Sequence, residues 1–376
     1  MSRHARRLMF VVTEDWYFVS HRLALAAAAR EAGYEVSVVT RVRDHGATIE
    51  AAGIRVISWE QDRGGLNPLR EAVSVRRLAG VYRREKPDLV HHVALKPALI
   101  GGLAARIAGV PRVINAVAGM GWLYSSGAGL AGTLRPLVRF AMRRLLNSTS
   151  VFALVQNPDD QRIMAELGVP AGRLCLVPGS GIDLTRFPVT AEPEGVPVVV
   201  LPARMLFDKG VRELVDAARL LHARGVRVRI VLAGTPDPQN RASIPPTDIA
   251  GWVRDGLVEW PGWVADMPAM LAAAHIVCLP SYREGLPKAL LEAAAAGRPI
   301  ITTDVPGCRE VVRDGENGLL VPARDATALA AAIERLVCDR PLRLTLGLRG
   351  RARAEREWAS PVVIAQILAL YAKALA

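Results

Sequence analysis

The sequence predicts an α/β protein made of two doubly wound domains, and three observations support this fold class. Short apolar, β-branched segments alternate with amphipathic helical segments along most of the chain. This alternation is typical of parallel strands that are joined by helical crossovers and covered on both faces. The rhythm restarts after a polar, proline-containing segment at 188–195. The length of 376 residues, with 51% hydrophobic side chains, suits two cores better than one.

Each predicted strand is short and almost continuously apolar, as expected for a buried parallel strand. The first series comprises 8–13, 36–41, 55–59, 89–93, 113–117, 152–156 and 174–177. The second series comprises 198–201, 229–233, 257–260, 275–279, 299–303 and 319–321. Helices are expected between the strands, for example at 21–31, 69–85, 212–223, 268–274, 288–296 and 326–337. The expected organisation is an N-terminal domain at 1–187, a linker at 188–195, a C-terminal domain at 196–357, and a helix within 358–376 that packs across the domain junction.

The basic composition allows three kinds of explanation. A net charge of +12 and a pI near 10.2 fit a nucleic-acid partner, an anionic membrane surface or a compositional bias toward arginine. Lysine accounts for few of the basic residues, which favours the bias, and the basic stripe with stacking aromatics of a nucleic-acid binder is not evident. Apolar runs stay below the roughly 18 residues that span a membrane. The four cysteines are widely spaced, which favours free thiols in a reducing, cytoplasmic compartment.

The segment 281–299 combines two carboxylates with a strand-to-helix loop. Pro287 suits the first turn of a helix, so Glu284 lies in the loop and Glu292 lies within the helix. The first amides of that helix form an anion site, which the helix dipole strengthens. Carboxylates beside such a site are suited to hold sugar hydroxyls. The alternative is a plain loop carboxylate followed by a capping or salt-bridging glutamate.

Two cations follow the first strand of the C-terminal domain. Arg204 leaves the end of this strand, and Lys209 precedes a helix that starts near position 211. A guanidinium fork and a mobile ammonium group can together clamp a diphosphate and stabilise the charge on it as it leaves. Ordinary solvated surface charges are the alternative.

These features together resemble the retaining GT-B glycosyltransferases of family four. One part of the match is a pair of glutamates with seven residues between them, preceded by Arg204 and Lys209. Another is the segment 177–187, which resembles the family's PxGvD…F segment, and the strand edge at 89–97 also matches. The resemblance covers nearly the whole chain and is densest from 173 to 322. It implies two doubly wound, Rossmann-like domains facing a central cleft.

The resemblance also implies roles in binding a nucleotide sugar, without a metal ion or another cofactor. Arg204 and Lys209 would grip the diphosphate. Glu284 would bind hydroxyls of the donor sugar, and Glu292 would hold the ribose. The other implied donor-binding residues are Trp263 and Val264 near the base, and Gly285, Leu286, Pro287 and Lys288 around the diphosphate.

Acceptor contacts are expected from the N-terminal domain. Its first loop lacks the glycine pair that family members often carry, and a later loop resembles a GlG loop of the subset that builds bacterial lipid-linked or surface glycans. A lysine after the strand at 89–93 can pair with an acceptor phosphate. The candidate acceptor-binding residues are Asp15, Trp16, Ser20, His21, Lys96, Gly119 and Gly121.

Two histidines, His91 and His92, lie in the predicted strand 89–93. Histidine often serves at clefts as a hydrogen-bonding or proton-transfer group, so both are candidate catalytic residues beside Arg204, Lys209 and Glu284. A satisfied core histidine is the alternative for each.

The segment 134–146 predicts a basic amphipathic helix, with arginines at 135, 139 and 143. Such a helix can lie on an anionic membrane or hold a diphosphate-lipid headgroup. A solvated helix face is the alternative.

The predicted function is the transfer of a hexose or N-acetylhexosamine from a UDP-sugar, with retention, to a glycan or a polyprenyl-diphosphate-linked saccharide. This activity would serve cell-surface polysaccharide or glycoprotein glycan assembly, in the cytoplasm or on the inner face of the membrane. The nearest alternative is a UDP-sugar 2-epimerase on the same fold. A nicotinamide dehydrogenase is disfavoured, because the first strand-to-helix turn of this chain lacks the glycine fingerprint of such enzymes. A non-catalytic membrane or nucleic-acid binder is the alternative from another class.

Overall fold

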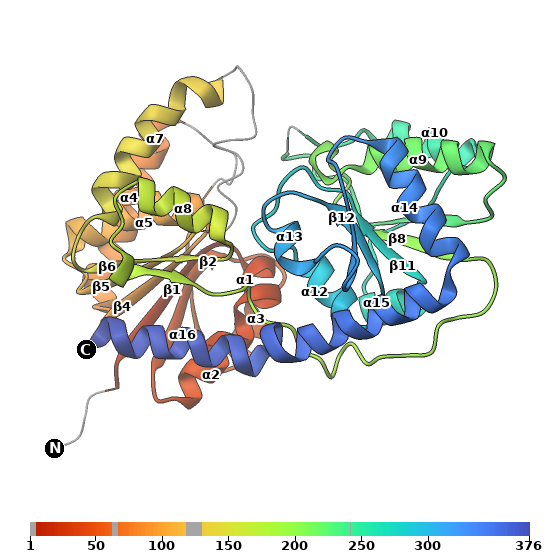
Figure 1. The fold of residues 1–376 in the computed structure, drawn as a ribbon. Coiled ribbons are helices and arrows are strands. Elements are labelled where there is room, and N and C mark those ends of the chain that lie inside the picture. The colour runs from red at the N-terminus through yellow and green to blue at the C-terminus, as the bar shows by residue number, and fades with distance from the viewer. Residues whose placement is uncertain (1–4, 62–66, 118–129, 241) are drawn as a thin grey trace. The chain divides into compact units, whose positions relative to one another are not determined.

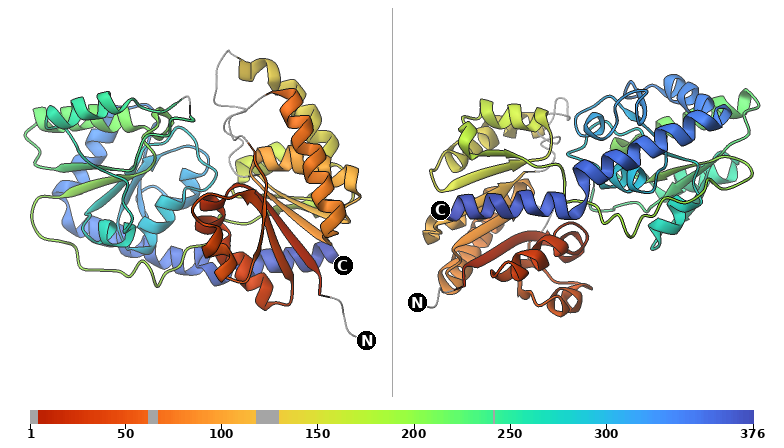
Figure 2. Two further views of the ribbon diagram at one scale, coloured as in Figure 1. Left: turned by 180° about the vertical axis from the view of Figure 1, so that it is seen from behind. Right: turned by 60° about the horizontal axis from the view of Figure 1, so that its bottom comes forward.

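The computed structural model describes residues 5–61, 67–117, 130–240 and 242–376. The chain forms two compact units (Figure 1). The first unit is residues 1–181 with 360–376, and the second is residues 182–359. In both units a parallel sheet lies between layers of helices (Figure 2).

Among the described residues, the first unit contains a seven-stranded sheet in the order β3-β2-β1-β4-β5-β6-β7, and every pairing is parallel. Each predicted strand is confirmed to within one residue at either end. The strands are β1 (Arg7–Glu14), β2 (Glu35–Arg41), β3 (Arg55–Ser58), β4 (Leu89–Val93), β5 (Arg112–Ala116), β6 (Val151–Val155) and β7 (Leu174–Leu176).

Two cores cover the two faces of this sheet. One contains Leu78, Tyr82 and Met142 and lies under α4, α5 and α7. The other contains Phe18 and Leu25 and lies under α1, α2 and the last helix. The helices are α1 (Asp15–His21), α2 (Leu23–Glu31), α3 (Gly46–Ala51), α4 (Pro68–Glu85), α5 (Leu95–Ala108), α7 (Leu130–Leu146), α8 (Pro158–Glu166) and α16 (Ser360–Leu375).

The second unit contains a six-stranded parallel sheet in the order β10-β9-β8-β11-β12-β13, again among the described residues. Its strands are β8 (Val198–Pro202), β9 (Arg229–Ala233), β10 (Glu259–Gly262), β11 (Ile276–Leu279), β12 (Ile300–Thr303) and β13 (Gly318–Val321). Its helices are α9 (Val211–Ala223), α10 (Pro246–Arg254), α11 (Met267–Ala272), α12 (Lys288–Ala295), α13 (Cys308–Val311), α14 (Ala326–Cys338) and α15 (Arg340–Arg353). The predicted α/β class and the two doubly wound sheets are confirmed.

The chain passes from one unit to the other twice, after Gly181 and after Ala359, and both positions differ from the expected domain boundaries. The first unit ends at Gly181 rather than at 187, because Ile182 donates a backbone hydrogen bond to Trp358 and Phe187 packs in a core of the second unit. The segment 188–195 is held to the second unit, since Glu192 accepts two hydrogen bonds from Arg343. The expected linker is therefore part of the second unit.

The C-terminal helix belongs to the first unit. In α16, Val363, Ile367 and Tyr371 are buried in the core beneath β1 and α2. The chain thus returns to its first unit after completing the second. A second local difference is α1, which forms at 15–21 where the sequence analysis expects a loop.

Candidate active site

The carboxyl edge of the second sheet gathers the residues predicted to bind the donor. The strand order reverses between β8 and β11, which pair directly. In open parallel sheets, ligands bind outside the carboxyl ends of the strands at such a switch point. β8 leads into the segment with Arg204 and Lys209, and β11 leads into the loop with Glu284. The two separate sequence signals therefore meet at one edge.

Lys209 and Glu284 form an ion pair at this edge. Lys209 Nζ donates a hydrogen bond to Glu284 Oε1, and the Ser281 hydroxyl donates to the same oxygen at 2.8 Å. The side chains of Lys209 and Glu284 are only 20% and 13% exposed. Among the described residues, no hydrogen bond to Glu284 Oε2 is present. That second oxygen is the one suited to accept a sugar hydroxyl.

Close backbone approach holds the two segments together. Gly210 follows Lys209 with φ of +70°, and a Cβ on Gly210 would lie 2.0 Å from the Pro280 carbonyl oxygen. Beside it, the Tyr282 amide donates to the Asp208 carbonyl at 2.9 Å. Only glycine adopts this conformation at this separation without displacing the backbone. The position of Lys209 against the Glu284 loop is thus set by the main chain.

The Glu284 loop is also fixed from β12 and the turn after it. The Glu284 amide donates to the Pro306 carbonyl at 3.1 Å, and the Thr303 hydroxyl donates to the Ser281 carbonyl. Gly307 has φ of +82°, and a Cβ there would lie 2.5 Å from the Glu284 carbonyl oxygen. These contacts hold the carboxylate in a preset orientation.

Arg204 is paired with Asp237. Arg204 Nη1 donates to Asp237 Oδ2 at 2.5 Å, and the Arg204 side chain is 39% exposed. Asp237 is itself positioned in its loop by a hydrogen bond from its amide to the Ser243 hydroxyl. The guanidinium is therefore oriented by a carboxylate, and it remains accessible to an anionic ligand.

The start of α12 supplies a further cationic element. Pro287 is the N-cap and no side chain caps the helix, so its first amides point out of the helix end. Lys288 Nζ lies 3.6 Å from Glu292 Oε1 on the next turn. Burial raises the pKa of Glu292, while Lys288 and Arg186 act in the opposite direction. The helix dipole and Lys288 both favour an anion here.

Of the remaining donor candidates, Trp263 is 77% exposed and Val264 is half-buried, just after β10. Leu286 and Pro287 are buried and Gly285 is partly exposed. A planar base can pack against an exposed indole, whereas the Leu286 side chain packs in a core of the second unit and Pro287 has no backbone N–H to donate.

Asp15 is inaccessible to a ligand because its side chain is buried. Its carboxylate is fully buried and accepts backbone hydrogen bonds from Trp16 at 2.7 Å, Arg43 at 2.6 Å and His45 at 3.0 Å. These bonds join the end of β1 to the segment after β2. The geometry therefore favours a structural role for Asp15 over the predicted acceptor contact.

The other acceptor candidates on α1 are more accessible. Trp16 is 37% exposed, and the Ser20 hydroxyl lies 2.6 Å from His21 Nδ1. The His21 ring stacks on Tyr17 with the ring centroids 4.0 Å apart. α1 thus presents a polar pair and an indole at the carboxyl end of β1.

His91 and His92 are both buried in the first unit. His92 Nδ1 donates to Asn115 Oδ1 at 2.7 Å, and the Tyr82 hydroxyl donates to His92 Nε2 at 2.9 Å. His91 stacks on Phe10 and its Nδ1 lies 2.6 Å from the Tyr371 hydroxyl. Burial lowers the pKa of both, to about 4 for His92. This environment favours the core alternative for both histidines.

Lys96 lies in the first turn of α5. Lys96 Nζ forms an ion pair with Glu71 Oε1 at 2.7 Å. Gly119 and Gly121 lie outside the described residues. Ser281 and Asp237, which were not among the predicted site residues, orient Glu284 and Arg204 respectively. The signal for Ser281 is its position three residues before Glu284, whereas no local signal identifies Asp237.

The predicted basic helix forms as α7. Leu137 and Phe140 are 63% and 58% exposed, and Arg143 and Arg144 are exposed beside them. The Arg135 side chain lies outside the described part of the helix. Among the described residues, no helix is both long and apolar enough to cross a membrane.

Two family models match the two units. The model described as glycosyl transferase 4-like matches residues 7–154, and the model described as glycosyl transferases group 1 matches residues 196–339. Together they cover most of the chain. The second match contains every residue of the switch-point site described above.

Known proteins are similar to this chain in sequence or in structure over nearly its full length. The N,N'-diacetylbacillosaminyl-diphospho-undecaprenol alpha-1,3-N-acetylgalactosaminyltransferase of Campylobacter jejuni is 28% identical over 366 residues, covering 93% of this chain and 94% of that protein. Sucrose-phosphate synthase from Thermosynechococcus elongatus superposes with a TM-score of 0.82 at 22% identity, covering 98% of both chains. HepE from Anabaena, in complex with UDP-glucose, gives 0.77 at 19% identity and covers 98% and 99%. The chain belongs to the group 1 glycosyl transferases and has the GT-B fold of two Rossmann-like domains.

Proposed function

We propose that this glycosyltransferase moves a hexose or N-acetylhexosamine from a UDP-sugar, with retention, to a lipid-linked saccharide. The name of the Campylobacter relative describes transfer to a diphospho-undecaprenol saccharide, and the HepE structure contains UDP-glucose. Both support the proposed donor and acceptor classes. The product would enter cell-surface polysaccharide or glycoprotein glycan assembly.

The Lys209–Glu284 pair is the observation that carries the proposal. Transfer requires a positively charged group that stabilises the departing diphosphate. Next to it, a hydrogen-bond acceptor must hold the hydroxyls of the donor sugar. Lys209 supplies the first and Glu284 Oε2 the second, on two segments locked together by their main chains. A preset arrangement stabilises charge as it develops, without reorganisation during the reaction.

Arg204 and the start of α12 complete the diphosphate site in this proposal. The diphosphate would replace Asp237 as the partner of Arg204. A phosphate, like a carboxylate, presents two oxygens that accept from the guanidinium N–H groups. Glu292 would accept from the ribose hydroxyls beside Lys288. Trp263 would contact the base. Charge stabilisation then comes from side chains and helix amides, without a metal ion.

Retention follows from attack on the face that the leaving group occupies. The bond from the anomeric carbon to the diphosphate oxygen breaks, and the acceptor hydroxyl oxygen bonds to that carbon on the same face. The hydroxyl proton passes to the departing phosphate oxygen. No enzyme nucleophile takes part, so the described residues act by orientation and charge.

A location in the cytoplasm, with peripheral attachment to the inner face of the cell membrane, is part of the same proposal. Exposed Leu137 and Phe140 lie beside exposed Arg143 and Arg144 on α7, which suits the interface of an anionic membrane. This surface would bring the enzyme to an acceptor anchored in the bilayer. We assign no nucleic-acid partner to the basic charge.

Single substitutions in the site test the proposal. Arg204→Ala, Lys209→Ala and Glu284→Ala are each expected to lower the transfer rate by at least about 100-fold, as when a preset charge-stabilising group is removed. Lys86→Ala, which alters an exposed lysine of the first unit, serves as the control. Full activity in all three variants would contradict the assignment.

Incubation with donor alone separates transfer from the epimerase alternative. A transferase leaves the sugar configuration unchanged and needs the acceptor for rapid turnover. Appearance of a 2-epimer of the UDP-sugar without any acceptor would reject the proposed reaction. Product NMR of the anomeric proton then distinguishes retention from inversion.

A further inference from the structure

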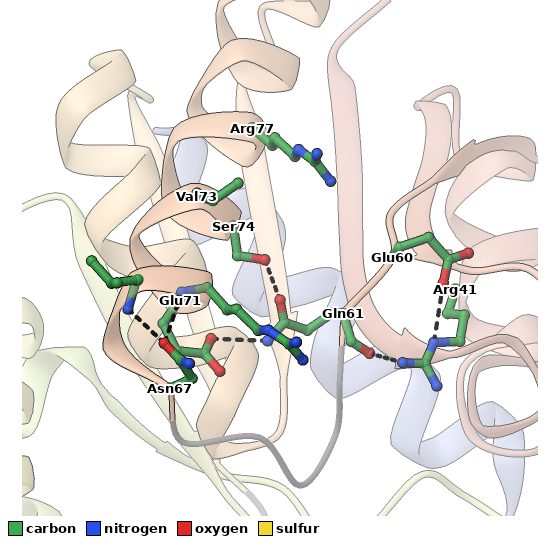
Figure 3. Close-up of a pocket in the computed structure, with 10 residues that line it drawn as sticks. Arg41, Glu60, Gln61, Asn67, Glu71, Val73, Ser74 and Arg77 are labelled. Carbon is green, nitrogen blue, oxygen red and sulfur yellow. Dashed lines mark hydrogen bonds and ion pairs between the residues drawn. The ribbon is translucent and has the colours of Figure 1, made fainter.

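The first unit contains a pocket that none of the candidate donor-binding, acceptor-binding or catalytic residues lines. Its volume is about 470 Å³, within the range of pockets that bind small ligands. Its walls come from the end of β2, the segment after β3 and the first three turns of α4 (Figure 3). It therefore lies at the carboxyl edge of the first sheet, where open parallel sheets bind their ligands.

One face of α4 forms a continuous wall of this pocket. Arg70, Val73, Ser74 and Arg77 occupy positions i, i+3, i+4 and i+7, which lie on one face of a helix. The two arginines are thus separated by about 10 Å along the helix axis. In Figure 3, Arg77 extends from α4 toward the side of the pocket where Arg41 lies.

The carboxylates of the pocket already have cationic partners. Glu60 Oε2 lies 3.5 Å from Arg41 Nε, and Glu71 pairs with Lys96 at 2.7 Å. Among the described residues, neither Arg70 nor Arg77 has a side-chain hydrogen bond or ion pair. Among the described lining residues, these two guanidinium groups are therefore the charges without a carboxylate partner.

The surrounding polar network keeps the wall in place. The Ser74 hydroxyl donates to Gln61 Oε1, and Gln61 Nε2 donates to Glu71 Oε2 at 2.9 Å. Asn67 caps α4 by accepting from the Leu69 amide at 3.0 Å. Val73 is 50% exposed and lies between the two arginines in sequence, so it offers an apolar surface to the carbon face of a sugar ring.

We infer that this pocket binds a glycosyl phosphate, with Arg70 and Arg77 holding the phosphate oxygens and Val73 contacting the sugar. Guanidinium groups bind phosphate through paired N–H donors, which gives orientation as well as affinity. That the bound group is the diphosphate-linked end of the acceptor rests on the proposed function. The Lys96–Glu71 pair, which joins α5 to the pocket wall, links this site to the residue predicted to meet an acceptor phosphate.

The test uses N-acetylglucosamine 1-phosphate and the full chain. Titration is followed by NMR or calorimetry, with saturating UDP present to occupy the proposed site in the second unit. Arg70→Gln and Arg77→Gln are each expected to weaken binding about tenfold, which corresponds to about 1.4 kcal/mol. Arg76→Gln changes an exposed arginine on another face of α4 and is expected to bind like the unaltered protein. Uncharged N-acetylglucosamine is expected to bind far more weakly.

Other outcomes would overturn the inference. Absence of binding, or equal binding by all three variants, would reject the pocket. Sedimentation with phosphatidylglycerol vesicles that is lost in Arg70→Gln and Arg77→Gln, without binding of the glycosyl phosphate, would assign the arginines to bilayer phosphate instead.

Thermal stabilisation by UDP tests the proposed function independently of the pocket. Pocket variants are expected to retain thermal stabilisation by UDP and to raise the KM for a lipid-linked acceptor. If UDP fails to stabilise any form, the donor proposal fails while the glycosyl phosphate titration still decides the pocket.

Discussion

The Tyr282 hydroxyl donates a 2.6 Å hydrogen bond to Glu213 Oε1, which ties the Glu284 loop to the first turn of α9. The guanidinium of Arg324 lies over the Tyr282 ring at 4.5 Å. Burial, together with the bond to Glu213, raises the pKa of Tyr282, so the hydroxyl remains a donor at neutral pH. The Lys209 segment lies directly before α9. One side-chain bond therefore reinforces the main-chain contacts between the two halves of the proposed donor site.

Removal of this bond tests its positioning role. Tyr282→Phe is expected to lower kcat about three- to tenfold, because the loss of one hydrogen bond to a charged group loosens the Lys209–Glu284 geometry. Glu213→Gln is expected to lower kcat less than Tyr282→Phe does, since the amide oxygen of the glutamine still accepts from the Tyr282 hydroxyl. Tyr34→Phe removes a hydroxyl with no hydrogen bond among the described residues and is the control. An unchanged kcat in Tyr282→Phe would argue against this role.

The Arg204–Asp237 pair predicts a gain in donor affinity. Asp237→Asn removes the carboxylate that competes with a diphosphate for the guanidinium, so the Kd for UDP is expected to fall about threefold or more at low salt. The measurement is calorimetric titration with UDP. Asp216→Asn breaks the exposed Arg219–Asp216 pair on α9, which has the same 2.5 Å separation, and should leave the Kd unchanged. Weaker UDP binding in Asp237→Asn would instead make Asp237 an orienting partner that the bound state retains.

The close approach of Gly210 to Pro280 predicts a steric effect in the proposed donor site. Gly210→Ala is expected to destabilise the protein and to lower the transfer rate, because the added Cβ meets a backbone oxygen and displaces Lys209. Gly225→Ala is the matched control, since Gly225 has φ of +71° and open space around its Cβ position. That control isolates the left-handed backbone cost of about 1–2 kcal/mol. Equal losses of unfolding free energy in the two variants would show that the contact with Pro280 adds nothing.

The buried histidines predict a stability loss in mild acid. Burial lowers the pKa of His92 to about 4, below its unfolded value, so the unfolded chain binds more protons between these two values. The stabilising contribution is present above the unfolded pKa and is lost as the pH falls toward 4, on the order of 3 kcal/mol in total. Urea unfolding at several pH values measures it. His92→Gln should remove the His92 share of this dependence and leave that of His91, whereas His222→Gln, on the exposed face of α9, should preserve all of it.

The strands and the switch-point motif were predictable from the sequence. Apolar β-branched runs between helical segments predicted the strands, and β4 and β9 agree with the predicted ranges to the residue. Lys209 and Glu284 were assigned to one site although 75 positions separate them. Parallel topology explains this success, because it carries the ends of successive strands to a single edge of the sheet.

Partners of single side chains required the tertiary structure. Asp15 directly follows an apolar strand and His92 lies within one, and the sequence leaves the burial of both residues open. Hydrogen bonds from elements distant in sequence decide that both are satisfied in the interior. The pairing of Arg204 with Asp237 and the pocket beside Arg70 and Arg77 likewise depend on how loops and helices meet.

By itself, the sequence determined the α/β class, the two parallel sheets and the strand ends that carry the proposed donor-binding residues. These depend on local hydrophobic periodicity and on glycine and proline positions, which act within a few residues. Only the tertiary structure decided which carboxylate holds each cation, which histidines are buried and which unit receives the last helix. Those outcomes depend on packing and desolvation between segments that are remote along the chain.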